Sequence, residues 1–336
     1  MKYVARLGLL ATLLLATLMT AAAPPAAASP KIRIGLVLPD LSNEAISNIN
    51  IGAHQRAKEL GNVEILTTGS YSGAEQASAI EDYVAEHVDV IVYDSIDAAA
   101  VGPAILKANA AKIPVIAIFS AASEGKNATL IAPDFEADGR MIGRWMAGKL
   151  GKGGKVALVE GNPTDTAGVE LDTGFTEGLA AGGITKLVAS EPTDWDPQRA
   201  FTVTGDMLTA HPDIQGIYAA IDDIALSSLQ AIKASGLEKH ILLAGHNATC
   251  EGLAAMLRGG LDYTVMDFPR EIGATSVDLA IKLKAGDQIP EVIKAQALGI
   301  DRATAQAVLA GNMSGIPPDL APNVEARVMA AKNGCK

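Results

Sequence analysis

Acidic and hydrogen-bonding side chains occur at the ends of several apolar, strand-like segments of this sequence. Asp94 ends "VDVIVYD", Ser120 follows "IPVIAIF", and Asp267 ends "LDYTVMD". In parallel α/β sheets, ligands bind beyond the carboxyl ends of the strands, so side chains in these loops are candidates for ligand binding. Carboxylates, hydroxyls and amides suit a small polar ligand. The candidate residues are Ser42, Asn43, Asp94, Phe119, Ser120, Thr166, Trp195, Asp222, His246, Asn247 and Asp267.

Several of these residues also have a purely structural explanation. Ser42 and Asn43 stand where a helix N-cap is expected, and Asp222 or its neighbour would cap the helix containing "IALSSLQAIKA". Phe119 follows "PVIAI" and fits the protein core as well as a ligand contact. The carboxylates that end buried strands are harder to explain in this way, because a buried carboxylate needs a partner.

Enzymatic and metal-binding motifs are incomplete. The segment "GSYSG" has tyrosine where a GxSxG nucleophile motif has serine. The segment "GKGGKV" precedes a strand-like segment and has no Ser or Thr after its lysine, so it predicts a helix-to-strand turn instead of a phosphate loop. His246 and Cys250 would need a third ligand to hold a metal, and none lies nearby in the sequence. We therefore expect no catalytic activity, metal or cofactor.

Apolar strand-like segments alternate with helix-length segments of 3.6-residue periodicity. Continuous apolar strands between amphipathic helices are typical of a parallel sheet covered on both faces, so the fold class is α/β. The strand-like segments are "IRIGLVL", "VDVIVYD", "IPVIAIF", "KVALVEG", "IQGIYAA" and "HILLAGH".

An internal repeat indicates that one supersecondary unit occurs twice. "RIGLVLP" from Arg33 and "KVALVEG" from Lys155 are followed by glycines and a glutamine at matching positions, always 122 residues apart. A constant offset of this kind predicts two similar doubly wound lobes. The matched pairs are Gly52 with Gly174, Gly61 with Gly183, and Gln76 with Gln198.

The chain is expected to cross between these lobes more than once. A strand pattern is followed by a helix pattern near Pro133, where we place the first crossing. The segment after Asp267 has another helix pattern, which we assign to the first lobe. Several crossings form a hinge. We assign residues 29–133 and 268–297 to the first lobe, and residues 134–267 and 298–336 to the second.

The first residues have the pattern of a secretory signal peptide. Lys2 and Arg6 precede an apolar run, and Ala26 and Ala28 mark a cleavage site, which leaves residues 1–28 as the leader. No later segment is apolar enough to span a membrane. The formal net charge is -11, and the sequence contains no run of basic residues. This charge disfavours nucleic acid and anionic lipid as partners.

Cys250 and Cys335 are the only cysteines. An exported protein with two cysteines can form one disulfide, and two buried thiols are the alternative. The tail after residue 314 has few apolar residues to hold it, so we expect the disulfide to tie it to the second lobe.

Successive blocks of the chain resemble the ribose-type periplasmic binding proteins, the type I solute-binding family of ABC importers. The blocks are "LVLPDLSNEAISNINIGAHQRAKELG", "VDVIVYDSIDAAAVGPAILKANAAKIPVIAIF", "LTAHPDIQGIYAAIDDIALSSLQAIKASG" and "LAGHNATCEGLAAMLRGGLDYTVMDFPREIG". The resemblance implies two lobes joined by a three-crossing hinge that closes on a ligand, a periplasmic location, and a monomer that delivers its ligand to an inner-membrane permease with its ATPase. Lactose-repressor relatives share this fold but carry a helix-turn-helix where this chain has a leader.

The resemblance is weakest at the positions that hold the ligand. This chain keeps Asn43 but has Ala45 and Ile46 in place of two aromatic residues, and it has Phe119 and Ser120 in place of an Asp-Arg pair. The family has another arginine before the Gly-Phe of the second-lobe helix, and the matching segment here, "VELDTGF", contains no arginine. The other replacements at ligand positions are Trp195 for phenylalanine, Ile221 for asparagine, His246 and Asn247 for Phe-Asp, and Asp267 for glutamine.

These replacements leave the identity of the ligand open. The family's arginines form bidentate hydrogen bonds with carboxylates or vicinal hydroxyls. Because this chain lacks them, an anionic ligand is disfavoured. Trp195, Phe119 and Asp267 favour a small sugar or polyol, with a cationic or zwitterionic amine as the alternative. Import is the leading function, and a sensor that signals to a membrane histidine kinase is the alternative; an enzyme ranks third.

Overall fold

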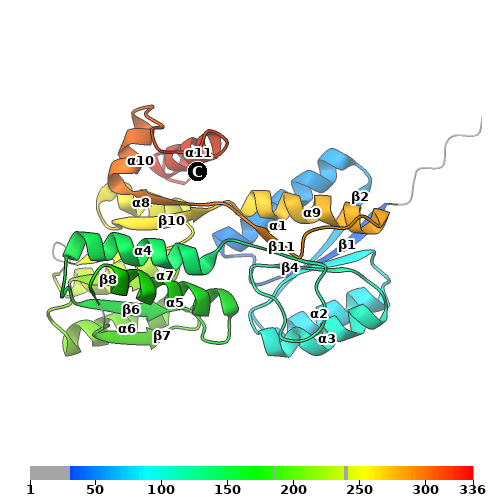
Figure 1. The fold of residues 1–336 in the computed structure, drawn as a ribbon, viewed down its shortest axis with the longest axis horizontal. Helices are drawn as coiled ribbons and strands as arrows, with labels where there is room; N and C mark the ends of the chain where they lie inside the picture. Colours follow the sequence, from blue (N-terminus) through cyan, green and yellow to red (C-terminus); the bar gives the residue numbers. More distant parts are fainter. Residues whose placement is uncertain (1–30, 185–186, 238–240, 336) are drawn as a thin grey trace, which may run out of the picture. The chain divides into compact units, whose positions relative to one another are not determined.

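Two six-stranded sheets, each covered by helices on both faces, organise the chain (Figure 1). The computed structural model describes residues 31–184, 187–237 and 241–335. The predicted leader, residues 1–28, lies outside the described residues. Both sheets belong to one compact unit, and they confirm the predicted α/β class with two doubly wound lobes.

The first lobe is built on a sheet with the strand order β11-β5-β4-β3-β1-β2, in which every neighbouring pair is parallel. Helices α1 and α9 cover one face, and α2 and α3 cover the other. Strands β3 and β4 are buried along their whole length, as their continuous apolar sequences predict. The elements are β1 (Ile32–Leu38), α1 (Glu44–Leu60), β2 (Val63–Gly69), α2 (Gly73–Ala85), β3 (Val90–Asp94), α3 (Ala98–Ala110), β4 (Val115–Ile118), β5 (Thr129–Ala132), α9 (Pro269–Ala285) and β11 (Val292–Lys294).

The second lobe is built on a sheet with the order β12-β10-β9-β8-β6-β7, in which only β12 is antiparallel to its neighbour. Helices α4 and α5 cover one face, and the remaining helices cover the other. The elements are α4 (Phe135–Leu150), β6 (Val156–Glu160), α5 (Thr166–Ala181), β7 (Ala189–Pro192), α6 (Pro197–Ala210), β8 (Gly216–Ala219), α7 (Asp222–Ala234), β9 (Leu242–Ala244), α8 (Cys250–Arg258), β10 (Tyr263–Asp267), β12 (Ala297–Asp301), α10 (Arg302–Leu309) and α11 (Ala321–Lys332).

The chain passes between the two sheets at three places: after β5, after β10 and between β11 and β12. Ala297 pairs with Asp267 in the second sheet, one residue before the boundary that the sequence indicated for the third passage. The antiparallel direction of β12 follows from this passage, because the chain enters the second lobe from the cleft side and runs back along β10. Among the helices of the described residues, none has both the length and the apolar character that crossing a bilayer requires.

Close helix pairs explain the glycines of the sequence repeat. A Cβ atom at Gly52 in α1 would lie less than 3.0 Å from the backbone of Arg270 in α9. A Cβ atom at Gly174 in α5 would meet the backbone of Glu136 in α4 in the same way. Each lobe therefore packs the first helix of its repeat against a helix that lies outside the repeat, with backbones in direct contact.

The C-terminal segment is attached to the second lobe by a disulfide between Cys250, the first residue of α8, and Cys335. The bond joins residues 85 positions apart. It fixes α11, whose buried residues Val324 and Val328 extend the core of this lobe.

Replacing both Cys250 and Cys335 with serine is expected to lower the free energy of unfolding by about 2–4 kcal/mol, because a closed loop restricts the unfolded chain. Urea denaturation with and without reductant measures the loss. Reductant should destabilise the wild-type protein and leave the double variant unchanged. Equal stability of the two proteins without reductant would contradict a stabilising bond.

Candidate ligand-binding site

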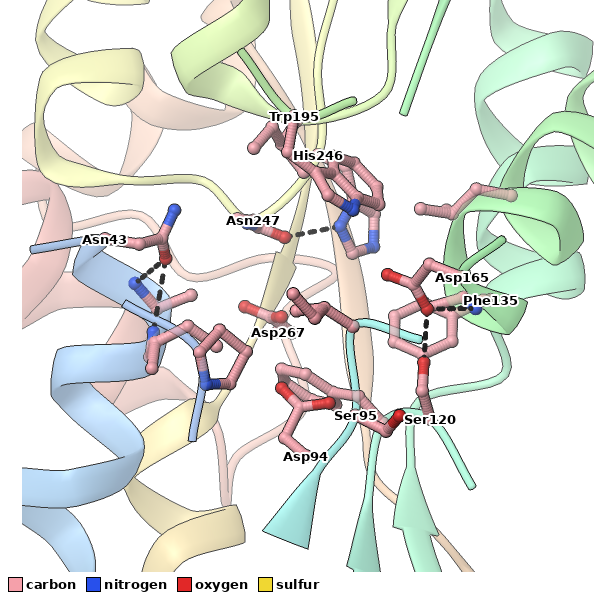
Figure 2. Close-up of a pocket in the computed structure, with 18 of the residues that line it drawn as sticks. Asn43, Asp94, Ser95, Ser120, Phe135, Asp165, Trp195, His246, Asn247 and Asp267 are labelled. Carbon is pink, nitrogen blue, oxygen red and sulfur yellow. Dashed lines mark hydrogen bonds between the residues drawn. The ribbon is translucent and has the colours of Figure 1, made fainter. Parts of the chain in front are cut away.

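A cavity lies between the two lobes, beyond the carboxyl ends of strands from both sheets (Figure 2). The empty space between its walls is about 650 Å³, part of which is open to solvent, and this lies within the range of about 300–1,000 Å³ that is usual for small-molecule sites. The lining residues are Pro39, Asn43, Ala45, Ile46, Tyr71, Asp94, Ser95, Ile96, Phe119, Ser120, Phe135, Asp165, Ala167, Leu171, Trp195, Ile221, His246, Asn247 and Asp267.

Asn43 both caps a helix and connects the lobes. Its Oδ1 atom accepts the backbone N–H groups of Ala45 and Ile46 at 2.9 and 3.2 Å, which caps α1. Its Nδ2 atom donates to Oδ2 of Asp223 in the second lobe at 3.0 Å. Ser42 instead bonds to Asp40 and lines a neighbouring surface pocket.

A second contact between the lobes lies at the N-terminus of α8. The backbone N–H of Cys250 donates to both carboxylate oxygens of Glu44, at 2.9 and 3.1 Å. Glu44 is the first residue of α1, so the contact joins the starts of two helices from different lobes. A carboxylate at a helix N-terminus is also favoured by the helix dipole.

Aromatic rings form much of the cavity wall. Phe119 has a positive φ of 56°, and its ring makes an edge contact with Phe135 at a centroid distance of 5.6 Å. Trp195 has a positive φ of 62°, and a Cβ atom at Gly161 would lie less than 3.0 Å from its ring. Backbone strain of this kind persists where the surrounding structure imposes it, commonly at ligand sites. Phe119 also packs against buried apolar residues of the core, so its position is compatible with both a core contact and a ligand contact.

His246 forms a buried ion pair at one side of the cavity. Its Nε2 atom lies 3.3 Å from Oδ2 of Asp138 in α4, and its Nδ1 atom lies 2.6 Å from Oδ1 of Asn247. Burial lowers the pKa of His246, but the hydrogen bond and the charge of Asp138 outweigh it, so the pKa is raised. When His246 is protonated, its charge is therefore balanced by Asp138. Cys250 is bonded to Cys335, and within the described ranges no cluster of three His, Cys, Asp or Glu side chains could hold a metal ion.

Arg327 of the C-terminal helix α11 supports the loop that carries His246. Asn247 and Ala248 have positive φ angles of 93° and 46°. The Arg327 guanidinium donates to their carbonyl oxygens at 2.7 and 2.6 Å and also to the carbonyl of Asp267. By binding these three carbonyl oxygens, Arg327 fixes the two strained residues and the end of β10. The C-terminal tail therefore takes part in shaping the cavity.

Three carboxyl groups line the cavity, and burial raises the pKa of each (Figure 2). The pKa of Asp94 is raised further by the negative charge of Asp165. Hydrogen bonds from Ser120 Oγ and Ala167 N lower the pKa of Asp165, but the effect of burial is larger. His246 and Arg327 oppose the effect of burial on Asp267.

Besides Ser42, two predicted residues do not line the cavity. Asp222 is fully buried, and its carboxylate accepts Thr249 N at 2.8 Å and Thr264 Oγ1 at 2.9 Å. It therefore organises the loop after β9 and does not line the cavity, and it does not cap α7, whose N-cap residue makes no side-chain bond. Burial raises its pKa to about 7. Thr166 begins α5, and its neighbour Asp165 lines the cavity instead.

Several lining residues were missed by the sequence analysis. Tyr71 follows the carboxyl end of β2, so the rule used for the other strands would have found it. Asp165 precedes a helix and could have been recognised as an N-cap that faces the cleft. Phe135 lies inside the first turn of α4, and no sequence signal separates it from the core.

Comparisons with known proteins identify the family. Residues 34–288 match the family described as "Periplasmic binding protein domain". The chain is 33% identical over 262 residues to the ribose import binding protein of Bacillus subtilis, which covers 78% of this chain and 85% of that protein. It is 32% identical over 259 residues to the ribose import binding protein of Escherichia coli, and the match covers 77% of this chain and 87% of that protein.

A solved structure agrees with this assignment. An ABC transporter periplasmic solute binding protein from Actinobacillus succinogenes, with bound D-allose, superposes with a TM-score of 0.77 and 26% identity, covering 82% of this chain and 99% of that chain. The resemblance inferred from the sequence blocks is confirmed, and the chain belongs to the periplasmic binding protein family.

Proposed function

We propose that this protein captures a small sugar or polyol between its two lobes and delivers it to an ABC permease with its ATPase. The observation that supports this most directly is the cavity between the lobes, which has the size of a small-molecule site and is lined by aromatic rings and hydrogen-bonding groups. Relatives named as ribose import binding proteins, and a similar structure with bound D-allose, favour the same ligand class.

The polar and apolar lining suits a polyhydroxylated ring. Trp195 and Phe119 present flat apolar faces, against which the C–H groups of a sugar pack. Asp94, Ser95 and Asp267 supply donors and acceptors for hydroxyl groups. In this proposal, residues 1–28 direct export to the periplasm, where the protein acts as a monomer, and residues 29–133 with 268–297 move as a lobe against the remainder.

Ligand binding is expected to raise thermal stability. A ligand present at a hundred times its dissociation constant adds about 2.7 kcal/mol to the free energy of unfolding, because it binds only the folded protein. Thermal-shift measurements with pentoses, hexoses and their polyols test this, and mass spectrometry of small molecules released from freshly purified protein identifies a retained ligand. If sugars, polyols and their amino derivatives all leave the melting temperature unchanged, the proposed function is wrong.

A further inference from the structure

We propose that the ligand is a sugar or polyol that carries a protonated amino group, and that this ammonium group lies against Asp94. The inference rests on the proposed function and narrows its ligand class. It is based on the charge of the cavity: three carboxyl groups line it, and its described lining residues include no lysine or arginine.

Asp94 is the carboxyl group with the least compensation. It ends β3, the residue is 5% exposed, the nearby charge is that of Asp165, which is also negative, and the one opposing influence on its pKa is a backbone hydrogen bond from Ser120. Asp165 approaches from the N-terminus of α5 in the second lobe. Closure of the lobes therefore brings two carboxyl groups together, and a cation between the lobes favours the charged form of both.

The cations near the cavity are engaged elsewhere. His246 is paired with Asp138 behind the cavity wall. Arg327 donates to three carbonyl oxygens and lies nearest to Asp267, not to Asp94. The protein thus supplies positive charge on the side of Asp267 and leaves the side of Asp94 for the ligand.

Asp267 gives an independent indication that a ligand completes this cavity. Its side chain is 1% exposed and lines the cavity, and among the described residues none donates a hydrogen bond to its Oδ1 atom. A buried acceptor without a donor is destabilising, so a donor from a ligand or a bound water is expected at this atom. Figure 2 shows Asp94 and Asp267 approaching the same cavity from different segments, so one small ligand can place an amine at one end and a hydroxyl at the other.

The aromatic lining also favours a cation. Tyr71, Phe119, Phe135 and Trp195 surround the same space. The faces of aromatic rings attract an ammonium group, most strongly where water is excluded. A neutral sugar gains nothing from this attraction, and it leaves Asp94 either protonated or charged without a partner.

Matched pairs of compounds test the proposal. D-Glucosamine is compared with D-glucose, and 1-amino-1-deoxy-D-ribitol with ribitol, by isothermal titration calorimetry in phosphate buffer, since Tris is itself an amino polyol. We expect at least one amino compound to bind the wild-type protein about tenfold or more tightly than its neutral partner, as for a charge-assisted contact of about 1.5–3 kcal/mol. Equal or tighter binding of the neutral compound in both pairs, or no binding of either amino compound, would overturn the inference while leaving the proposed function intact.

The Asp94→Asn variant assigns the preference to this side chain. It should lose about 100-fold or more in affinity for the amino compound and about tenfold or less for the neutral one, because only the amine is left as an unpaired buried charge. Asp172→Asn is the matched control, since Asp172 is a largely buried carboxyl on α5 whose pKa is raised to about 8 but which does not line the cavity. It should leave both affinities unchanged. Equal losses for both compounds in Asp94→Asn, with folding verified by circular dichroism, would contradict an ammonium contact at Asp94.

Discussion

Replacing Trp195 with alanine is expected to weaken ligand binding by about 30- to 1,000-fold, the range that corresponds to about 2–4 kcal/mol for a buried aromatic contact. The ring forms part of the cavity wall, and its position is fixed by the close approach of Gly161 and by a strained backbone. Removal of the ring both eliminates the contact and opens the cavity to water. The loss should therefore appear with every ligand that the protein binds.

Calorimetry on Trp195→Ala measures this loss, and Trp145→Phe provides the control. Trp145 is the only other tryptophan, and it stacks on Tyr263 at a centroid distance of 4.7 Å on a helix that covers the second sheet. The control variant should bind like the wild-type protein and retain a ligand-dependent change of fluorescence, which then comes from Trp195 alone. Binding by Trp195→Ala at wild-type affinity would mean that the ligand occupies another site.

The Gly139→Ala substitution in α4 is expected to lower the free energy of unfolding by about 1–3 kcal/mol, the usual penalty for overpacking a core. Its Cβ atom would lie less than 3.0 Å from the carbonyl oxygen of Leu171 and the backbone nitrogen of Phe175 in α5. Backbone atoms cannot rotate away as a flexible side chain can, so the two helices must separate. The gain in helix propensity, about 1 kcal/mol, offsets only part of this penalty.

Gly148→Ala tests the same substitution in the same helix without the steric conflict. Gly148 is exposed, and no neighbouring atom lies within 4 Å of a Cβ atom built there. This variant should be more stable than wild type by about 0.4–1 kcal/mol. Urea denaturation measures the free energy of unfolding of both variants. Destabilisation of both by similar amounts would show that the close contact between α4 and α5 is not the cause.

The architecture could be predicted from the sequence because the strands of a doubly wound sheet are continuously apolar. β3 and β4 are buried over their full length, and their sequences "VIVYD" and "VIAI" leave no polar face. The glycine pair of the repeat, Gly52 and Gly174, could be recognised for a similar reason, because the same close helix contact recurs in each lobe.

The cavity could be predicted only in part, because loop position does not determine side-chain direction. Asp94, Asn43 and Asp267 end strands or begin helices at the cleft, and they line the cavity. Asp222 occupies a similar place in the sequence, but its carboxylate turns into the space left by Gly245 and Gly252. Whether a loop residue faces inward thus depends on distant glycines that a strand pattern does not reveal.

In the hinge motion that the proposed function requires, hydrogen bonds that join the lobes would favour the closed form of the empty protein. Glu44 binds the start of α8 and does not line the cavity, and Asp223 holds Asn43 from the second lobe. One such hydrogen bond to a carboxylate, worth about 1.5 kcal/mol, would raise the ratio of closed to open molecules about tenfold. Since the apparent dissociation constant is the intrinsic constant divided by the closed fraction, substitutions at Glu44 would change the concentration at which the protein responds without changing which molecule it selects.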